Sequence, residues 1–339
     1  MLSCVQSLEG HTDCVWSVAW SPNGDILATS GSDRSIRIWT KQSNEDSGRA
    51  SWLCKSVLTD GHTRTVRSVG FSPCARYLVS TSFDSTIVVW ERNSASGELE
   101  ILSTLEGHEN EVKSAVFSVS GRYLASCSRD KSVWVWEMDE EDDFQCSSIL
   151  QTHTQDVKQV LFSPVEDLLV SCSYDNSIRF YTFDGDDWSL MQKIEQAHQS
   201  TVWSVAFNSQ GDKLASCSAD GTIKIWHKRL VDGSSQKWEL GCTLDNGQSH
   251  PLPIYSVDWC PLTDYLASGC ADNGIRIWRQ VEPSLSDCAE VSNFEPVQLV
   301  QSAHEQDVNC VRWNPKVAGL LASASDDGYV KLWQLHNWQ

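Results

Sequence analysis

The chain has 339 residues, 13 cysteines and a formal net charge of −19 at pH 7. So acidic a surface repels phosphate backbones and anionic membranes, and we therefore expect neither nucleic acid nor a membrane as a direct partner. The N-terminal residues lack a charged segment followed by an apolar core, and no apolar run is long enough to span a bilayer. We therefore expect no signal peptide and no membrane span.

The first predicted element is the strand Ser3–Leu8, which precedes the first Gly-His pair of the chain. At the other end, only Gln334–Gln339 follow the last recurring aromatic residue, Trp333. These residues are too few for the outer strand that follows the same position in earlier repeats. We predict that Ser3–Leu8 supplies the outer strand of the last repeat and closes a ring, because closure leaves no free sheet edge.

A complete repeat extends from Gly107 to Trp136. Its apolar runs are short, alternate with polar residues and end at turn residues, which is typical of β-strands. Seven copies of this unit follow one another, at a period of 45 to 55 residues. They begin near seven histidines, which are His11, His62, His108, His153, His198, His250 and His304.

Three further residue types recur in every copy. A turn aspartate lies 22 residues after each histidine, or 23 in the last copy, and an aromatic residue lies six residues beyond it. A serine or threonine stands four residues before each aspartate. We predict that this set forms a structural hydrogen-bond network, which satisfies polar groups that the sheet would otherwise bury unpaired. In the third repeat the set is His108, Ser126, Asp130 and Trp136.

The recurring set imitates a hydrolase triad, but catalysis needs one assembled site beside a substrate pocket. This set occurs seven times in the same local frame, so we expect no enzyme activity. The fourth copy carries Tyr181 where the others have tryptophan. We expect its network to differ and its repeat to be the weakest.

A unit of this length that opens with Gly-His and closes with Trp resembles the WD repeat, which forms one four-stranded propeller blade. The resemblance implies an all-β fold, a seven-bladed WD-repeat β-propeller. Seven blades need about 339 residues, so we expect residues 1–339 to form a single domain. The most variable segments follow each closing aromatic residue, and we predict that they are loops at one end of the propeller.

The cysteines favour packing roles in a reducing compartment. Their number is odd, no CxxC pair occurs, and Cys127, Cys172 and Cys217 recur at the same strand position. We therefore expect a cytoplasmic protein that can also be nuclear. Thiols spread along the repeats do not converge as cluster ligands do, so we expect no bound metal and no cofactor.

In the WD fold, two positions of each blade face the central mouth. One follows the first Val or Ile of the first strand, and the other precedes the turn aspartate. Arginines and aromatic residues gather at these positions, and such residues are favoured at binding hot spots. We predict an acidic ligand, either a peptide segment or a chain terminus with an aromatic or apolar side chain. The alternative is that the cations only neutralise neighbouring carboxylates. The predicted partner-binding residues are Trp16, Arg67, Phe83, Lys113, Arg129, Lys158, Tyr174, Trp203 and Tyr255.

Two acidic runs, Glu137–Asp143 and Asp184–Asp187, occur in neighbouring repeats. Such runs are usually solvated surface, and a docking face for a basic partner is the alternative.

Several segments together resemble a more specific family, the WD-repeat subunit of the cytosolic iron–sulfur protein assembly machinery. The resemblance implies a non-enzymatic adaptor that helps to deliver iron–sulfur clusters to cytosolic and nuclear apoproteins. It also implies protein partners, namely a small carrier-type subunit, a HEAT-repeat subunit, an iron-only-hydrogenase-like protein and apo client proteins. The family's exposed mouth arginine corresponds to Arg129. The segments are Arg64–Val69, Gly107–Ser114, Cys127–Glu137, His153–Lys158, Ser200–Phe207 and Gln306–Pro315.

Other functions of WD propellers remain as alternatives. A ubiquitin-ligase substrate receptor often has Trp-Asp-x-Arg after a blade, and no closing aromatic residue here is followed by aspartate. A chromatin peptide reader would also use the mouth, but a methylated cationic ligand prefers acidic or aromatic walls to a mouth that contains Arg67 and Arg129.

Overall fold

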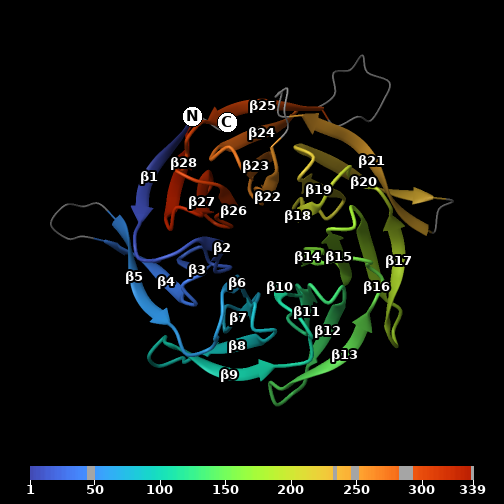
Figure 1. Cartoon of the computed structure of the whole chain (residues 1–339), viewed down its shortest axis with the longest axis horizontal. Helices are drawn as coiled ribbons and strands as arrows, with labels where there is room; N and C mark the ends of the chain where they lie inside the picture. Colours follow the sequence, from blue (N-terminus) through green and yellow to red (C-terminus); the bar gives the residue numbers. More distant parts are fainter. Residues whose placement is uncertain (44–49, 232–234, 246–251, 282–292, 337–339) are drawn as a thin grey trace.

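A computed structural model describes residues 1–43, 50–231, 235–245, 252–281 and 293–336. In this part of the chain, 28 strands form seven four-stranded antiparallel sheets. The sheets are arranged as blades around a common axis, with the first strand of each blade innermost (Figure 1). The all-β, seven-bladed fold is therefore confirmed.

The blades follow the order of the chain. Blade one contains β2 (Val15–Trp20), β3 (Ile26–Gly31), β4 (Ile36–Ser43) and β5 (Ala50–Leu58). Blade two contains β6 (Val66–Phe71), β7 (Tyr77–Ser82), β8 (Ile87–Arg92) and β9 (Leu99–Leu105). Blade three contains β10 (Val112–Phe117), β11 (Tyr123–Ser128), β12 (Val133–Met138) and β13 (Phe144–Leu150). Blade four contains β14 (Val157–Phe162), β15 (Leu168–Ser173), β16 (Ile178–Phe183) and β17 (Trp188–Ile194).

The remaining blades repeat this order. Blade five contains β18 (Val202–Phe207), β19 (Lys213–Ser218), β20 (Thr222–Val231) and β21 (Ser235–Asp245). Blade six contains β22 (Ile254–Trp259), β23 (Tyr265–Cys270), β24 (Ile275–Val281) and β25 (Asn293–Val300). Blade seven contains β26 (Val308–Trp313), β27 (Leu320–Ser325), β28 (Val330–Leu335) and β1 (Leu2–Leu8).

The ring is closed by the N-terminal strand, as predicted. Strand β1 pairs antiparallel with β28, so that Leu2 lies opposite Leu335 and Leu8 opposite Val330. Met1 and His336 exchange backbone hydrogen bonds at 2.7 and 3.0 Å, and β1 lies beside β28 in Figure 1. The side-chain amide of Gln6 also exchanges two hydrogen bonds with the backbone of Trp52 in β5, at 2.8 and 2.9 Å. Closure therefore ties blade seven to blade one.

The hydrophobic core lies between the blades. Seven clusters of buried residues occur in the described part of the chain, and each combines side chains from two neighbouring blades. The second strand of each blade is buried almost throughout; β11, for example, is buried from Tyr123 to Ser128. Because each blade buries its faces against both neighbours, no blade has a complete core of its own.

Each innermost strand contains a β-bulge near its start. In β6, for example, Val66 pairs with Ser82 and Ser68 with Thr81, so that Arg67 has no partner in the ladder. A bulge re-aims the side chain of the extra residue. The same bulge occurs in the other six blades, and the seven extra residues are Trp16, Arg67, Lys113, Lys158, Trp203, Tyr255 and Asn309.

The prediction that loops follow each closing aromatic residue was only partly right. Strands β20 and β21 stay paired from Thr222 opposite Asp245 to Val231 opposite Ser235, well past the aromatic residue of that blade. The outer strand of this blade also carries a buried aromatic side chain. Trp238 is 2% exposed and stacks on Phe180 of blade four, with the ring centroids 5.1 Å apart. Trp52 in β5 is buried in the same way.

We predict that the closing strand contributes through Leu8, which is 2% exposed and packs in the cluster between blades seven and one. Leu8→Ala should lower the free energy of unfolding by about 2 to 5 kcal/mol. Val5 on the same strand is 55% exposed, so Val5→Ala should change it by less than about 0.5 kcal/mol. Urea unfolding followed by tryptophan fluorescence measures both, and equal unfolding midpoints for the two variants would contradict the prediction.

Candidate functional site

The recurring polar set forms a network in blade three. His108 lies with Nδ1 2.7 Å from a carboxylate oxygen of Asp130 and Nε2 2.8 Å from the hydroxyl of Ser126. The indole of Trp136 donates to the same hydroxyl at 3.0 Å. Burial alone would raise the pKa of Asp130, but hydrogen bonds from His108 and Ser132 outweigh it and lower the pKa to about 2.

The same contacts recur in blades one, two, five and seven. The histidine contacts both the aspartate and the strand hydroxyl, and the tryptophan donates to that hydroxyl at 2.8 to 3.0 Å. The four sets are His11, Thr29, Asp33 and Trp39; His62, Ser80, Asp84 and Trp90; His198, Ser216, Asp220 and Trp226; and His304, Ser323, Asp327 and Trp333.

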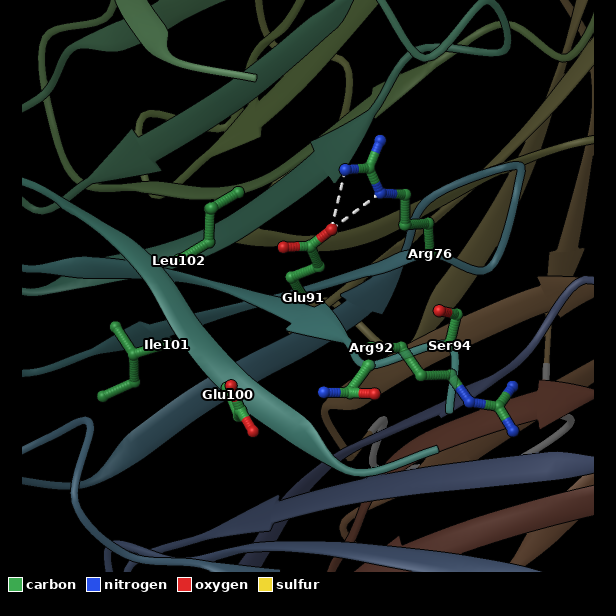
Figure 2. A pocket seen from close by; sticks show the side chains of 8 residues that line it. Arg76, Glu91, Arg92, Ser94, Glu100, Ile101 and Leu102 are labelled. Carbon is green, nitrogen blue, oxygen red and sulfur yellow. Dashed lines mark hydrogen bonds and ion pairs between the residues drawn. The ribbon is translucent and has the colours of Figure 1, made fainter. Parts of the chain in front are cut away.

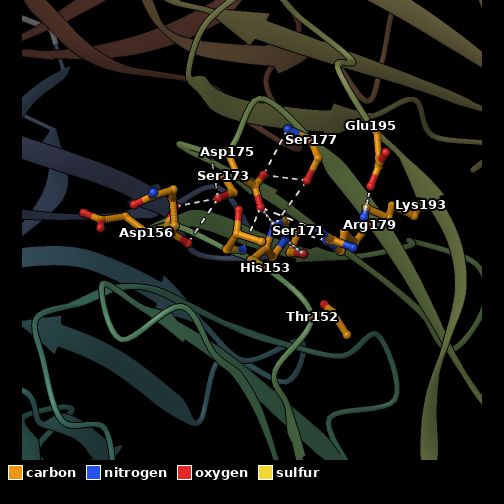
Figure 3. A network of polar contacts seen from close by, with 12 residues as sticks. Thr152, His153, Asp156, Ser171, Ser173, Asp175, Ser177, Arg179, Lys193 and Glu195 are labelled. Carbon is orange, nitrogen blue, oxygen red and sulfur yellow. Dashed lines mark hydrogen bonds and ion pairs between the residues drawn. The ribbon is translucent and has the colours of Figure 1, made fainter.

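Blade four keeps its network despite the tyrosine. The hydroxyl of Tyr181 lies 3.2 Å from that of Ser171 and 2.6 Å from that of Thr152. His153 still contacts Ser171 and Asp175, at 2.7 and 2.9 Å (Figure 3). The network therefore differs, as we expected, but the difference is an added partner for the aromatic residue.

Blade six departs further from the pattern. His250 lies outside the described residues. Arg276 donates two hydrogen bonds to Asp272, at 2.6 and 3.1 Å. The hydroxyl of Ser268 and the indole nitrogen of Trp278 are buried without a hydrogen-bond partner in the described part of the chain. Sequence reasoning missed Arg276, although an arginine four residues after a turn aspartate also occurs at Arg37 and Arg179.

The structure gathers the seven bulge residues around the propeller axis. They line one cavity of about 50 Å³, the channel cavity. Its wall is completed by Gln159, Cys310, Arg312 and five serines, which are Ser17, Ser68, Ser114, Ser204 and Ser256. Arg312 was also missed. It shares a repeat position with Asp258 and with residues that are apolar or glycine in the other blades, and aligning the repeats would have found it.

Aromatic rings hold the cations of the mouth. The guanidinium of Arg67 lies 4.9 Å from the ring centre of Trp16, and the ammonium of Lys113 lies 4.2 Å from that of Phe83. Lys158 lies 4.9 Å from the ring centre of Trp203. The ring contacts leave N–H donors of Arg67 and Lys113 available to a ligand, whereas Lys158 also donates to Asp156 at 3.5 Å.

The other predicted residues complete the mouth. Tyr174 contacts Lys158, with the ammonium 5.2 Å from the ring centre, and Tyr255 packs edge-on against Trp203 at 5.2 Å. Arg129 stands on the rim, where its side chain is 56% exposed and pairs with Glu111 at 3.2 Å. All nine predicted residues therefore lie around the mouth.

Several positive charges gather in a partly dehydrated part of the mouth. Burial lowers the pKa of Lys113 to about 8, the charges of Arg67 and Lys158 act in the same direction, and Glu111 and Asp156 partly oppose them. Burial also lowers the pKa of Lys158, which Asp156 partly offsets from 3.5 Å. Like charges gathered in this way favour an anionic ligand, because an anion relieves their mutual repulsion.

The acidic runs have partners within the chain. Asp142 pairs with Arg76 of blade two at 2.7 Å, and Glu137 pairs with Arg122 at 2.5 Å. Asp184 accepts hydrogen bonds from the backbone of the turn that it opens. These contacts support a structural role for part of each run, and docking of a basic partner there stays a prediction.

Arg76 also borders an open cavity of about 550 Å³ on the outside of blade two. Figure 2 shows its guanidinium bonded to Glu91, with the side chains of Ile101 and Leu102 on β9. Because the charge of Arg76 is matched by Glu91 and Asp142, this cavity offers a ligand less electrostatic attraction than the mouth does.

Two further observations concern metals and membranes. Within the described ranges, no group of three or more histidine, cysteine, aspartate or glutamate residues is placed to hold a metal ion. No helix in the described part of the chain is long and apolar enough to cross a membrane.

Seven blades with a repeated His–hydroxyl–Asp–aromatic network define a WD-repeat β-propeller. The WD40 family model, described as "WD domain, G-beta repeat", matches residues 2–40, 52–91, 99–137, 144–182, 188–227, 241–279 and 296–334.

Curated relatives show to which family of WD40 proteins the chain belongs. The chain is 47% identical to the Culex quinquefasciatus protein named "Probable cytosolic iron-sulfur protein assembly protein Ciao1", over 99% of this chain and 98% of the relative. It is 55% identical to the CIAO1 protein of Rattus norvegicus, which has the same description, over 95% and 93%. It is 51% identical to "Protein CIA1" of Arabidopsis thaliana, over 98% and 96%. The chain therefore belongs to the Ciao1/CIA1 family of WD40 proteins, and the resemblance seen in its sequence is confirmed.

We predict that the network stabilises each blade through its central hydroxyl. Ser126→Ala should lower the free energy of unfolding by about 1 to 3 kcal/mol, because it leaves His108 Nε2 and the Trp136 indole buried without a partner. Ser268→Ala is the matched control, since that hydroxyl has no partner among the described residues. Its removal should leave stability unchanged or raise it. Chemical unfolding compares the two, and equal losses would contradict the prediction.

We also predict a loss of stability in acid. The pKa values of Asp130 and Asp327 are about 2 in the folded chain against an ordinary 3.8, because hydrogen bonds from His108 and His304 outweigh burial. The unfolded chain therefore binds protons first as the pH falls. Stability should be complete above pH 4 and should decline towards pH 2, by about 2 kcal/mol for each carboxylate. Urea unfolding at pH 5, 4 and 3 measures the slope, which Asp130→Asn should make shallower. An unchanged slope in that variant would count against the network as its source.

Proposed function

We propose that the chain is a non-catalytic adaptor of the cytosolic iron–sulfur protein assembly machinery. In this role it helps to deliver iron–sulfur clusters to apoproteins of the cytosol and nucleus, and it works in both compartments. Family membership supports a place in this machinery, since the relatives carry its name. The partners that we propose are a small carrier-type subunit, a HEAT-repeat subunit, an iron-only-hydrogenase-like protein and apo client proteins.

The mouth is the observation that carries this proposal. It presents an exposed guanidinium at Arg129 and an aromatic ring at Tyr174, which is 55% exposed. Arginine and tyrosine are the residue types on which protein interfaces concentrate their binding energy. The Arg129 guanidinium bonds Glu111 through one terminal nitrogen, so its other N–H groups can bind a carboxylate of a partner. An acidic partner segment with an apolar or aromatic side chain matches this surface.

The state of the histidines supports the absence of catalysis. In the third blade both ring nitrogens of His108 already have partners, Asp130 and Ser126, and the ring is buried. A general base needs a free nitrogen within reach of a substrate. The network therefore stabilises the fold, and partner proteins bind at the surface of the propeller.

The test compares two arginines that flank opposite ends of one strand and have similar exposure and the same kind of ion-pair partner. Arg129 follows β11 at the mouth, and Arg122 precedes β11 at the opposite end of the same strand. Their side chains are 56% and 57% exposed, and each pairs with one glutamate. Proteins that co-purify with the wild type, Arg129→Glu and Arg122→Glu are quantified after all three are shown to have the same melting temperature.

We expect the wild type and Arg122→Glu to retain iron–sulfur assembly factors and client proteins. Arg129→Glu should lose at least one of these partners by tenfold or more, because reversal of the charge repels the partner's carboxylate. Equal recovery by both variants would remove the mouth from the proposal. If the wild type retrieves chromatin or ubiquitin-ligase subunits in place of assembly factors, the adaptor role itself is wrong.

A further inference from the structure

The channel cavity has a wall composition that the adaptor role does not explain. Four of its lining side chains are cationic, and none is a carboxylate. Five serines from five different blades lie in the same wall, beside the cations. The chain as a whole carries a net charge of −19, so this gathering of positive groups stands out against its overall charge. The cations are Arg67, Lys113, Lys158 and Arg312.

Two of these cations have no directly bonded anion. The side chains of Arg67 and Lys113 make no hydrogen bond and no ion pair in the described part of the chain, and they contact the rings of Trp16 and Phe83. Carboxylates act on them only from farther away, Asp326 on Arg67 and Glu111 on Lys113. An aromatic face attracts a cation, but it does not neutralise the charge. It also does not accept hydrogen bonds from all of the N–H groups of the cation. The donors of both side chains are therefore available inside the cavity.

The side chain of Arg312 is held by hydrogen bonds and contributes positive charge at the other end of the channel cavity from the mouth. One of its terminal nitrogens donates to the backbone oxygen of Val311 at 2.8 Å and to the hydroxyl of Ser256 at 3.2 Å. Arg312 lies near enough to Arg67 for its charge to add to the effect of burial, which lowers the pKa of Arg67. Asp258 lines an adjoining cavity of about 330 Å³, which shares Arg312 and four other lining residues with the channel cavity. Asp258 acts on Arg312 through its charge and raises the pKa of Arg312, whereas Arg67 and Lys113 line only the channel cavity.

The size of the cavity limits what it can hold. Its volume of about 50 Å³ has room for roughly three or four water-sized groups. A nucleotide or another ligand of that size needs about 300 Å³ or more. The space, the excess of positive charge and the ring of hydroxyls all match a small anion with several oxygen atoms.

We propose that the channel cavity binds a small oxyanion of the phosphate type, with Arg67 and Lys113 as its cationic ligands and Arg312 as the wall beneath it. Guanidinium and ammonium groups donate charge-assisted hydrogen bonds to such an anion, and the serine hydroxyls supply neutral donors. The anion links blades two, three and seven across the axis, around which their inner strands β6, β10 and β26 are arranged (Figure 1). It therefore acts as a central ligand that stabilises the closed ring.

The experiment uses the purified full-length chain and sodium phosphate, titrated at constant ionic strength with chloride as the balancing anion. Isothermal titration calorimetry and phosphorus-31 NMR line broadening measure binding directly. The variant is Arg67→Gln, which removes the charge and retains a polar side chain. The matched control is Arg64→Gln, because Arg64 is exposed outside the cavity and donates to the backbone oxygen of Phe83 at 2.6 Å.

We expect the wild type and Arg64→Gln to bind one phosphate saturably, and their melting temperatures to rise with phosphate concentration. Arg67→Gln should bind at least tenfold more weakly. Absence of saturable binding by the wild type would overturn the proposal, as would an affinity of Arg67→Gln within twofold of the wild type. If circular dichroism shows that Arg67→Gln does not fold, Lys113→Gln takes its place under the same criteria.

This inference is independent of the proposed adaptor function, because the titration contains no partner protein. Arg129→Glu should still bind phosphate, since Arg129 does not line the channel cavity. The two proposals can therefore fail separately. Arg129→Glu can lose partners while it binds phosphate normally, or it can keep its partners while the wild type binds no phosphate.

Discussion

Closure of the ring is the constraint on which the rest of the structure depends. Every hydrophobic cluster of the described chain lies between two blades, so each blade relies on both neighbours for burial of its faces. An open ring would leave two blades half-exposed. The pairing of β1 with β28 removes that defect, and the exchange between Gln6 and Trp52 carries the contact across to the first blade. A short strand at one end of the chain thereby stabilises contacts all around the propeller.

The closed ring also determines where a binding surface can arise. Seven inner strands converge on one axis, and a bulge at the start of each turns one side chain out of the ladder. Side chains from distant parts of the sequence, such as Trp16 and Asn309, therefore meet in one cavity. The repeated positions build the fold, and the seven bulge positions, which differ from blade to blade, give the mouth its chemistry.

Much of the fold could be predicted from the sequence, because the same pattern of strand and turn residues occurs in seven repeats. The spacing of His108, Ser126 and Asp130 located the turns, and the shortage of residues after Trp333 predicted the closing strand. The extension of β20 and β21 was missed, because no local pattern in the segment after Trp226 marks where the pairing ends. Blade six was misjudged for a similar reason, since Arg276 reaches Asp272 only once the strands are folded.

The contacts within the candidate site could be predicted less well than the fold, because the sequence of one repeat does not show which side chains of other blades lie next to it. The bulge positions could be named in advance, yet several of their partners could not, because those contacts cross between blades. Lys113 of blade three meets Phe83 of blade two, and Arg67 of blade two meets Trp16 of blade one. These two cations rest on an aromatic ring of the preceding blade, whereas Lys158 contacts Trp203 of the following blade and pairs with Asp156. The surface of the chain is acidic, but several positive charges gather in a partly dehydrated space at its axis. Positive charge that folding buries without a counter-ion destabilises a chain on its own, and a bound anion removes that cost.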